Sequence, residues 1–284
     1  METGTLYLCA TPIGNLEDIS MRTLSILKQV DLIACEDTRH SLKLLNHFEI
    51  SKPLTSYHEH NKAEKGEVLL QKMKEGTNIA LVSDAGTPAI SDPGEDLVKK
   101  CIESGIKVVP IPGPAALISA LIVSGQDTAR FTFEGFLPVN RRSRDERLKC
   151  LENETRTMIF YEAPHKLVRT LDDMYEVFGD RSITIVKEIT KIHESVTKTT
   201  LGEAVKHFEQ AIPKGEFVLV LAGKSEQEIK SEAEKAFENM SITEHVDSLI
   251  AQGIDKKEAI KQVARLRNLP KRDVYNAYMN KEED

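Results

Sequence analysis

Short apolar runs alternate with amphipathic stretches along the first part of the chain. Residues 5–10, 31–35, 78–82 and 107–111 are apolar with little polar interruption, which predicts strands that are buried on both faces of a parallel sheet. Between them, residues 21–30, 41–48, 63–75 and 95–104 carry apolar side chains at helical spacing. This alternation predicts an open, mostly parallel sheet that is covered by helices.

A second region begins near Pro112-Gly113-Pro114, where regular structure must break. We expect a helix over residues 115–123, an extended segment over 131–136, and strands over 157–161, 182–187, 195–200 and 216–221. Residues 195–200 alternate polar and apolar side chains, which is typical of an antiparallel strand. The region therefore predicts a second α/β domain with a mixed sheet.

The composition changes after Gly223. A charged, helical stretch over 225–241 precedes three short predicted helices at 243–252, 256–267 and 271–280. Tight turns between short helices indicate a helix-turn-helix-like module. Residues 255–273 hold seven basic and three acidic side chains, which suits either nucleic-acid binding or a solvated face of a small docking bundle. We predict domains at residues 1–113, 114–224 and 225–284.

Composition narrows the class of protein. The chain has 284 residues, 40% of them hydrophobic, and a net charge of −7. No run approaches the ~20 apolar residues of a membrane span, and no secretory signal is visible. We therefore expect a cytoplasmic protein that does not associate with a membrane. Four widely spaced cysteines favour reduced thiols. Few aromatic residues and the acidic balance argue against a broad surface that coats nucleic acid.

Several common catalytic motifs are absent. No Gly-x-Gly-x-x-Gly follows a predicted strand, and Val218 occupies the position of the first glycine of a phosphate loop that would end at Gly223-Lys224-Ser225. His58-Glu59-His60 lacks the spacing of a helical zinc site, and no Gly-x-Ser-x-Gly is present. NAD enzymes, P-loop ATPases, zinc hydrolases and serine hydrolases are therefore disfavoured, and we expect no metal.

Three loops rich in glycine and proline each follow a predicted strand. They span residues 11–16, 83–94 and 112–116. In an open parallel sheet, ligands bind beyond the carboxyl ends of the strands, and small residues there let the backbone approach the ligand. Asp84, in the longest loop, is suited to accept a hydrogen bond from a ribose hydroxyl or an amine. The loops predict a ligand crevice.

These loops belong to a series of motifs that follow one another along the chain. The other motifs are Cys35-Glu36-Asp37-Thr38-Arg39, Ser56-Tyr57-His58-Glu59-His60-Asn61, Phe160-Tyr161-Glu162-Ala163-Pro164-His165-Lys166, Lys187-Glu188-Ile189-Thr190-Lys191 and residues 215–223. The series resembles the rRNA methyltransferase branch of the tetrapyrrole (corrin/porphyrin) methylase superfamily over about residues 4–223. The resemblance implies a two-domain α/β homodimer with S-adenosylmethionine in the cleft between domains. It also implies 2′-O-methylation of a cytidine in the decoding centre of small-subunit (16S) rRNA, either free or in the assembled 30S subunit.

The resemblance also assigns a cofactor site, residue by residue. It places Pro12 near the methionine part of the cofactor, the long loop and the alanines beside the cofactor, and Tyr161 with the 189–190 segment on the adenine side. The expected contacts are Pro12, Asp84, Ala85, Gly86, Pro88, Ile90, Ser91, Ala115, Ala116, Tyr161, Ile189 and Thr190. Asp84-Ala85-Gly86-Thr87-Pro88 replaces the Gly-Asp-Pro of tetrapyrrole methylases, which favours RNA over a macrocycle as substrate.

Methyl transfer to a hydroxyl needs in-line positioning and a group that weakens the O–H bond. Charged side chains follow several predicted strands, and the candidates are Glu188, His165, Glu162, Lys191 and Asp37, with Glu188 or His165 preferred as the base. Each has a structural alternative. Asp37 can cap the next helix, His165 can lie on the exposed side of a helix that starts at Pro164, and Glu188 can pair with Lys191.

RNA contact requires cations, and the densest basic run lies just after residues 136–138. The candidates for the RNA surface are Arg39, His58, Arg141, Arg142, Arg144 and Lys166. A solvated helix start is the structural alternative for the arginine run. Two other functions stay open: a methylase of a tetrapyrrole precursor, and a non-catalytic nucleic-acid-binding regulator that acts through the C-terminal helices.

Overall fold

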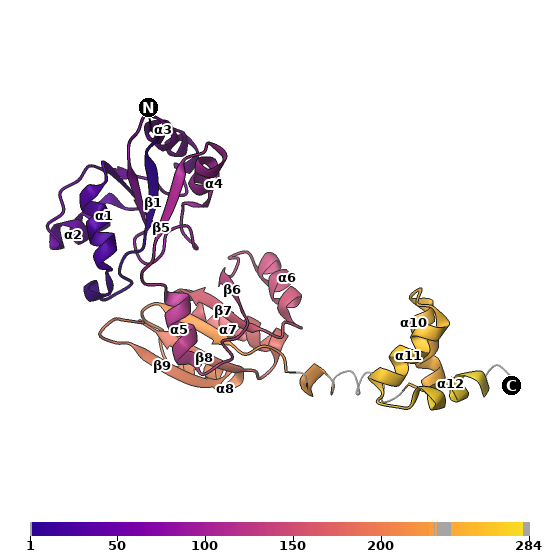
Figure 1. Cartoon of the computed structure of the whole chain (residues 1–284). Coiled ribbons are helices and arrows are strands. Elements are labelled where there is room, and N and C mark those ends of the chain that lie inside the picture. The colour runs from indigo at the N-terminus through magenta and orange to yellow at the C-terminus, as the bar shows by residue number, and fades with distance from the viewer. Residues whose placement is uncertain (1, 226, 230, 232–239, 281–284) are drawn as a thin grey trace. The chain divides into compact units, whose positions relative to one another are not determined.

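The computed structural model describes residues 2–225, 227–229, 231 and 240–280, and they form two compact units. The first unit contains Met1–Leu151 and Arg156–Ala222, and the second contains Glu152–Thr155 and Gly223–Asp284. Both sheets belong to the first unit (Figure 1). The predicted division at residues 113 and 224 stays a prediction, and the expected helix over 225–241 lies largely outside the described residues.

The first sheet is parallel, with strand order β3-β2-β4-β1-β5. Its strands are β1 (Thr5–Cys9), β2 (Leu32–Cys35), β3 (Leu54–Ser56), β4 (Ile79–Val82) and β5 (Lys107–Ile111). All four residues of β4 are buried, as expected for the central strand of a sheet that is covered on both faces. Edge strand β3 was not predicted, because its three half-buried residues carry almost no periodicity.

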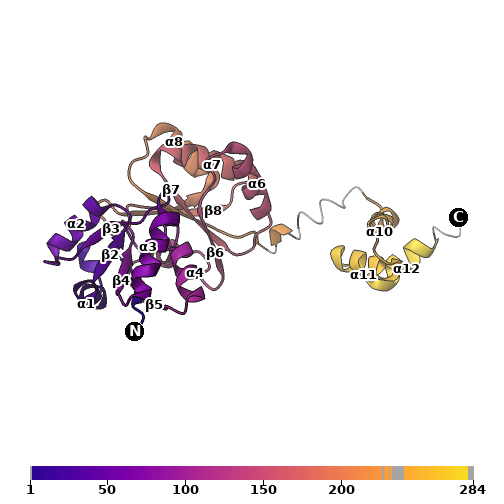
Figure 2. The same cartoon turned by 90° about the horizontal axis from the view of Figure 1, so that it is seen from above.

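Helices cover both faces of this sheet (Figure 2). They are α1 (Met21–Gln29), α2 (Thr38–His47), α3 (Lys62–Lys74) and α4 (Glu95–Glu103), and the short 3₁₀ helix η1 (Leu16–Asp18) precedes α1. Leu27 of α1 and Leu45 of α2 pack into one core with Ile33, whereas Leu69 of α3 and Leu97 of α4 pack into another with Leu81. The predicted open α/β sheet is confirmed.

The second sheet is mixed, with order β6-β7-β10-β8-β9. Its strands are β6 (Phe131–Phe136), β7 (Thr157–Glu162), β8 (Ser182–Lys187), β9 (Ser195–Thr200) and β10 (Phe217–Leu221). β9 pairs antiparallel with β8, as its alternation predicted, and β10 is buried at all five positions. One face carries α5 (Ala116–Ser124), and the other carries α6 (Arg141–Leu151), α7 (Pro164–Phe178) and α8 (Leu201–Gln210).

The second unit contains α10 (Ile242–Ala251), α11 (Lys256–Leu266) and α12 (Lys271–Asn280). These three helices enclose a separate core that includes Val246, Ile260, Val263 and Val274. None of the helices in the described part of the chain is both long and apolar enough to cross a membrane.

Candidate active site

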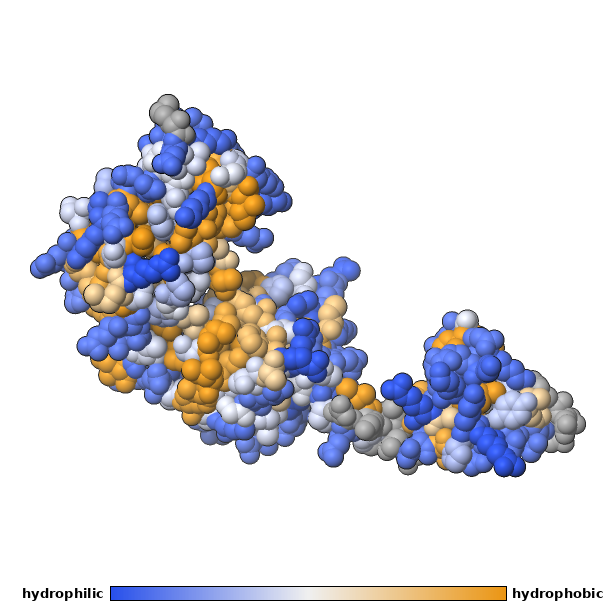
Figure 3. Space-filling view, in the orientation of Figure 1, coloured by the Kyte–Doolittle hydropathy of each residue, from blue (hydrophilic) through white to orange (hydrophobic). Residues whose placement is uncertain are grey.

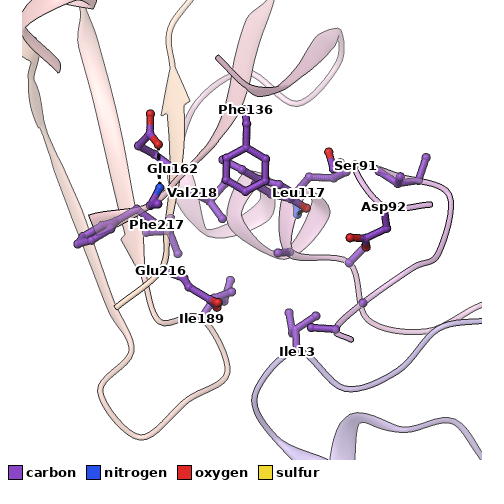
Figure 4. A pocket seen from close by; sticks show the side chains of 18 of the residues that line it. Ile13, Ser91, Asp92, Leu117, Phe136, Glu162, Ile189, Glu216, Phe217 and Val218 are labelled. Atoms are coloured by element: carbon purple, nitrogen blue, oxygen red, sulfur yellow. Dashed lines mark hydrogen bonds between the residues drawn. The ribbon is translucent and has the colours of Figure 1, made fainter. Parts of the chain in front are cut away.

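The loops at the carboxyl ends of β1, β4 and β5 meet one end of the second sheet around a cavity of about 550 Å³ (Figure 4). Ile13, the 84–87 and 90–92 segments, and the start of α5 line one side of the cavity. The ends of β6, β7 and β8 and the start of β10 line the other. A volume of this size lies in the usual range of small-molecule sites, about 300–1,000 Å³.

The 83–94 loop is tied to the other two strand-end loops by hydrogen bonds. Thr11 N donates to Gly86 O (2.9 Å), Gly86 N donates to Thr11 O (3.1 Å), and Thr87 Oγ1 donates to Pro114 O (3.1 Å). Gly86 has φ +83°, and a Cβ there would lie 3.2 Å from Ile13 Cγ2, so a larger residue would be strained. The three predicted loops therefore form one structure at the cavity.

Backbone strain is concentrated beside the cavity. Ala89 and Ser91 have φ of 68° and 60°, and Glu188 and Thr190 have φ of 52° and 66°. Each pair flanks an isoleucine, Ile90 or Ile189, that lines the cavity. Non-glycine residues in the left-handed region cost roughly 1–3 kcal/mol each and persist where surrounding contacts hold them, often at functional sites.

An ion-pair network holds the 188–194 loop. The Glu188 carboxylate accepts from Lys191 Nζ at 2.9 Å and from the backbone N–H of Glu216 at 2.8 Å, and Lys191 Nζ also contacts Glu216 Oε2 at 2.9 Å. The hydrogen bond from Glu216 and the contact with Lys191 lower the pKa of Glu188. Neither Glu188 nor Lys191 is among the described residues that line the cavity. Their geometry indicates a structural pair, which is the alternative considered for Glu188.

Asp92 faces the cavity and was not among the predicted site residues (Figure 4). Burial, followed by the negative charge of Glu36, raises the pKa of Asp92 to about 6, while a hydrogen bond from Ser83 acts in the opposite direction. Burial and the charge of Asp84 likewise raise the pKa of Glu36. A carboxyl group with such a pKa can accept a proton near neutral pH. The sequence signal was limited to the position of Asp92 in the 83–94 loop.

Aromatic side chains form part of the cavity wall. The Tyr161 hydroxyl accepts from Leu117 N at 3.1 Å, and its ring contacts Phe133 and Phe136 at centroid distances of 4.9 and 5.6 Å. Burial raises the pKa of Tyr161, so its hydroxyl stays protonated. Phe136 lies at the end of β6 and is 54% exposed. An apolar wall of this kind suits a flat heterocycle.

The predicted residues divide into those that line the cavity and those that do not. The cavity brings together Asp84, Ala85, Gly86, Ile90, Ser91, Ala115, Ala116, Tyr161, Ile189, Glu162 and His165. Pro12, Pro88 and Thr190 are chain neighbours of lining residues. Of the described residues, those that lie outside the cavity wall include Asp37, Arg39, His58 and Lys166.

Two of the acidic residues predicted for the site stabilise the first turns of helices. The buried carboxylate of Glu162 accepts from Thr170 Oγ1 (2.5 Å) and Ala163 N (2.8 Å), which secures the first turns of α7. Asp37 accepts from Arg39 N at 2.8 Å and so caps α2, which is its predicted alternative. The hydrogen bonds from Arg39 hold the pKa of Asp37 well below its usual range. The Arg39 side chain is 88% exposed.

The arginine run at the start of α6 combines surface and buried roles. Arg141 and Arg142 are exposed and pair with Asp145 and Glu146, one helical turn along. Arg144 is only 4% exposed. Its Nε contacts Asp173 Oδ2 at 2.6 Å, and its Nη1 donates to Val139 O at 3.1 Å. The structure thus corrects the expectation for Arg144, which holds α6 against α7 and is unavailable to RNA.

The histidines of the predicted surface occupy different settings. His165 is exposed at the start of α7 and lines the cavity. His58 is half-buried, with its backbone N–H donating to Asn61 Oδ1 at 2.9 Å. Across the described residues, no group of three or more His, Cys, Asp or Glu side chains is arranged to hold a metal ion.

The chemical character of the residues that line the cavity fits S-adenosylmethionine. Asp84 and Asp92 supply negative charge, which favours a ligand that carries sulfonium and ammonium groups. The small side chains of Ala115 and Ala116 let a ligand approach the backbone closely, and Tyr161 and Phe136 form the apolar wall. Backbone groups of the strained 89–91 and 188–190 segments lie next to this wall.

Comparisons with known proteins decide the family. The sequence profile described as Tetrapyrrole (Corrin/Porphyrin) Methylases matches residues 5–205. A ribosomal RNA small subunit methyltransferase I of Halalkalibacterium halodurans is 51% identical over 98% of this chain and 95% of its own. One of the same name from Synechocystis sp. is 48% identical over 99% of both chains. The chain belongs to the ribosomal RNA small subunit methyltransferase I family of tetrapyrrole methylases.

Solved structures agree on the fold of this methylase. A uroporphyrin-III-C-methyltransferase from Thermus thermophilus has a TM-score of 0.53 at 17% identity, covering 76% of this chain and 94% of that one. A diphthine synthase has a TM-score of 0.59 at 14% identity, covering 77% and 90%. The predicted family, fold class and methyl donor, S-adenosylmethionine, are confirmed.

Proposed function

We propose that this methylase transfers a methyl group to the ribose 2′-hydroxyl of a cytidine in the decoding centre of small-subunit rRNA. The observation that carries the proposal is the near-full-length similarity, at 48–51% identity, to proteins named for methylation of small-subunit rRNA. The similarity spans the C-terminal helices as well as the two sheets, whereas the tetrapyrrole methylase profile ends at residue 205. RNA is therefore favoured over a macrocycle as substrate.

The chain's own residues prepare the hydroxyl for attack. Bound S-adenosylmethionine supplies an electrophilic methyl group on a sulfonium, which leaves as a neutral thioether. The Asp84-to-Asp92 loop and the Ile189 segment hold the cofactor in the cavity. Asp92 accepts the proton of the ribose hydroxyl, because its carboxylate faces the cavity and its pKa of about 6 leaves it ionised at neutral pH. Glu188 and Lys191 act in this proposal by holding the 188–194 loop.

Basic side chains guide the RNA to the cavity. Arg39, at the start of α2, and Arg141 and Arg142, at the start of α6, are 75–88% exposed. His58, near the end of β3, and Lys166, in the first turn of α7, are half-buried at strand ends. Arginine binds phosphate through its planar fork, and exchanging an exposed intramolecular pair for a phosphate costs little. We assign these five residues to the substrate surface.

The methylase acts as a homodimer in this proposal. The outer face of α5 exposes Ile118, Ile122 and Val123, which are 44%, 69% and 47% exposed. Figure 3 shows an apolar patch over this helix. An apolar helix face next to the cavity suits a self-complementary contact around a two-fold axis.

The decisive experiment measures tritium transfer from labelled S-adenosylmethionine to small subunits that lack their own modifications, and to protein-free 16S rRNA. Nuclease digestion and nucleoside analysis then locate the label. Label in 2′-O-methylcytidine at one site supports the proposal, and the better of the two substrates shows whether the assembled 30S subunit is required. Label in another nucleoside, or none although the cofactor binds in calorimetry, contradicts the proposed reaction.

A further inference from the structure

The C-terminal helices form a unit with its own core. Ser241 and Glu244 cap α10 reciprocally, and Asp255 caps α11. α11 and α12 are joined by residues 267–270, where Asn268 has φ 51°. Short helices around such a tight turn have the form of a helix-turn-helix module.

Two of the seven basic residues in the 255–273 segment are engaged within the unit. Arg267 donates from Nη2 to Met240 O at 2.6 Å and from Nε to His245 Nδ1 at 3.1 Å, so it ties α11 to the start of α10. Lys256 Nζ lies 5.0 Å from the centroid of the Tyr278 ring. Arg267 and Lys256 therefore stabilise the fold of the helical unit.

The other five basic residues of the 255–273 segment face solvent. Lys257, Lys261 and Arg265 recur every four residues along α11, and all three are exposed. Lys271 and Arg272 occupy the exposed first turn of α12, and Tyr275, one turn later, is 49% exposed. Among the described residues, Lys261 alone of the five is ion-paired, at 3.4 Å from Glu258. We call Lys257, Lys261, Arg265, Lys271, Arg272 and Tyr275 the basic segment.

Charge and chemistry indicate what the basic segment binds. Residues 255–273 carry a net charge of +4 in a chain whose total is −7, so positive charge is concentrated here. Phosphate oxygens are the usual partners of such unpaired lysines and arginines, and an exposed tyrosine among them can stack on an unpaired base.

We propose that the basic segment is a second RNA-binding surface, which contacts the phosphate backbone of small-subunit rRNA outside the active-site cavity. This inference rests on the proposed function for the identity of the RNA. The segment adds affinity through phosphate contacts, while the cavity selects the nucleotide.

The test uses the full chain with the double substitution Lys271→Glu and Arg272→Glu. Lys28→Glu with Lys72→Glu is the matched control, because both lysines are exposed on α1 and α3 of the first unit and the net charge changes equally. Binding to protein-free 16S rRNA is measured without cofactor across a salt series. We expect the affinity of K271E/R272E to fall about tenfold or more relative to the control, and the salt slope to decrease by about 2.

A second substitution, Tyr275→Ala, removes an exposed ring and leaves the core residues in place; we expect several-fold weaker RNA binding. In both variants kcat for methyl transfer and the affinity for S-adenosylmethionine should match those of the natural chain, and KM for RNA should rise. Binding and salt slope equal to the control overturn the inference. So does a loss of affinity for assembled subunits but not for protein-free rRNA, which would assign the surface to a protein partner.

The two proposals fail separately in this design. RNA binding that depends on the basic segment, without methylation of that RNA, would overturn the proposed reaction and support the second surface. Normal methylation with RNA binding that is insensitive to K271E/R272E would do the reverse.

Discussion

Asp92 combines cavity exposure with a carboxyl group whose ionised form is disfavoured. Since its pKa is raised to about 6, the free enzyme loses the carboxylate as the pH falls through 6. We therefore predict that kcat/KM for S-adenosylmethionine rises with pH through about 6 and then levels. Asp92→Asn should lower the rate roughly 10²- to 10⁴-fold and abolish this acidic limb. Calorimetry should show that cofactor binding changes much less than the rate.

Asp96→Asn provides the matched control, because Asp96 is an exposed aspartate of α4 that pairs with Lys62. It should keep both the rate and the pH profile. If the acidic limb of the pH profile persists in D92N but disappears in His165→Asn, His165 is the proton acceptor.

Arg144 and Arg142 lie two residues apart and have opposite environments. Arg144→Ala leaves Asp173 buried without its principal partner, and we expect the free energy of unfolding to fall by about 3–5 kcal/mol. Arg142→Ala removes an exposed pair and should change it by less than about 0.5 kcal/mol while weakening RNA binding. Urea denaturation of both variants measures this. Equal stability losses would contradict the assignment of Arg144 to the fold.

At the scale of elements, the 188–194 loop depends on a single cation between two carboxylates. Without Lys191, Glu188 and Glu216 retain like charges on adjacent chain segments, and the strained 188–190 backbone loses a contact that holds it. Lys191→Ala should raise the Kd for S-adenosylmethionine about 3- to 10-fold, equivalent to roughly 1 kcal/mol, with kcat nearly unchanged. Isothermal calorimetry and saturating kinetics separate the two effects.

Lys206→Ala, on the exposed side of α8, is the control for the loss of one lysine and should leave both constants unchanged. If K191A instead lowers kcat and leaves the Kd intact, Lys191 belongs to the chemistry.

Elements with strong local patterns were predictable, and tertiary contacts explain the rest. The continuous apolar runs at residues 78–82 and 216–221 predicted strands, and the structure places β4 and β10 at the centres of their sheets. α2 begins at Thr38 rather than at residue 41, because Asp37 caps it. The three ligand loops could be expected from glycine, proline and their positions after strands. The pKa of Asp92 depends on Glu36, 56 positions away, and the pairing of Glu188 depends on Glu216, so neither was visible in the sequence.

At the scale of the whole molecule, the apolar face of α5 and the basic segment belong to different units. The first unit carries the cavity and the apolar face of α5, and the second carries the basic segment. Separate surfaces allow the chain to pair with a copy of itself through the α5 face, while the basic segment adds RNA contacts to those of the first unit. Each surface can therefore be altered without changing the cavity.

The proposed dimer gives the α5 face a distinctive response to mutation. In a two-fold contact, one substitution enters the interface twice, so Ile122→Asp would bring two carboxylates into an apolar contact. We expect the dimer dissociation constant to rise at least about 100-fold, as measured by sedimentation equilibrium. Ile102→Asp is the control, because Ile102 lies on α4 and is 65% exposed, close to the 69% of Ile122. Dissociation by I122D but not I102D would place the contact on α5. A natural chain that sediments as a monomer, or I122D that remains dimeric, would contradict it, because the apolar face of α5 would then have another occupant.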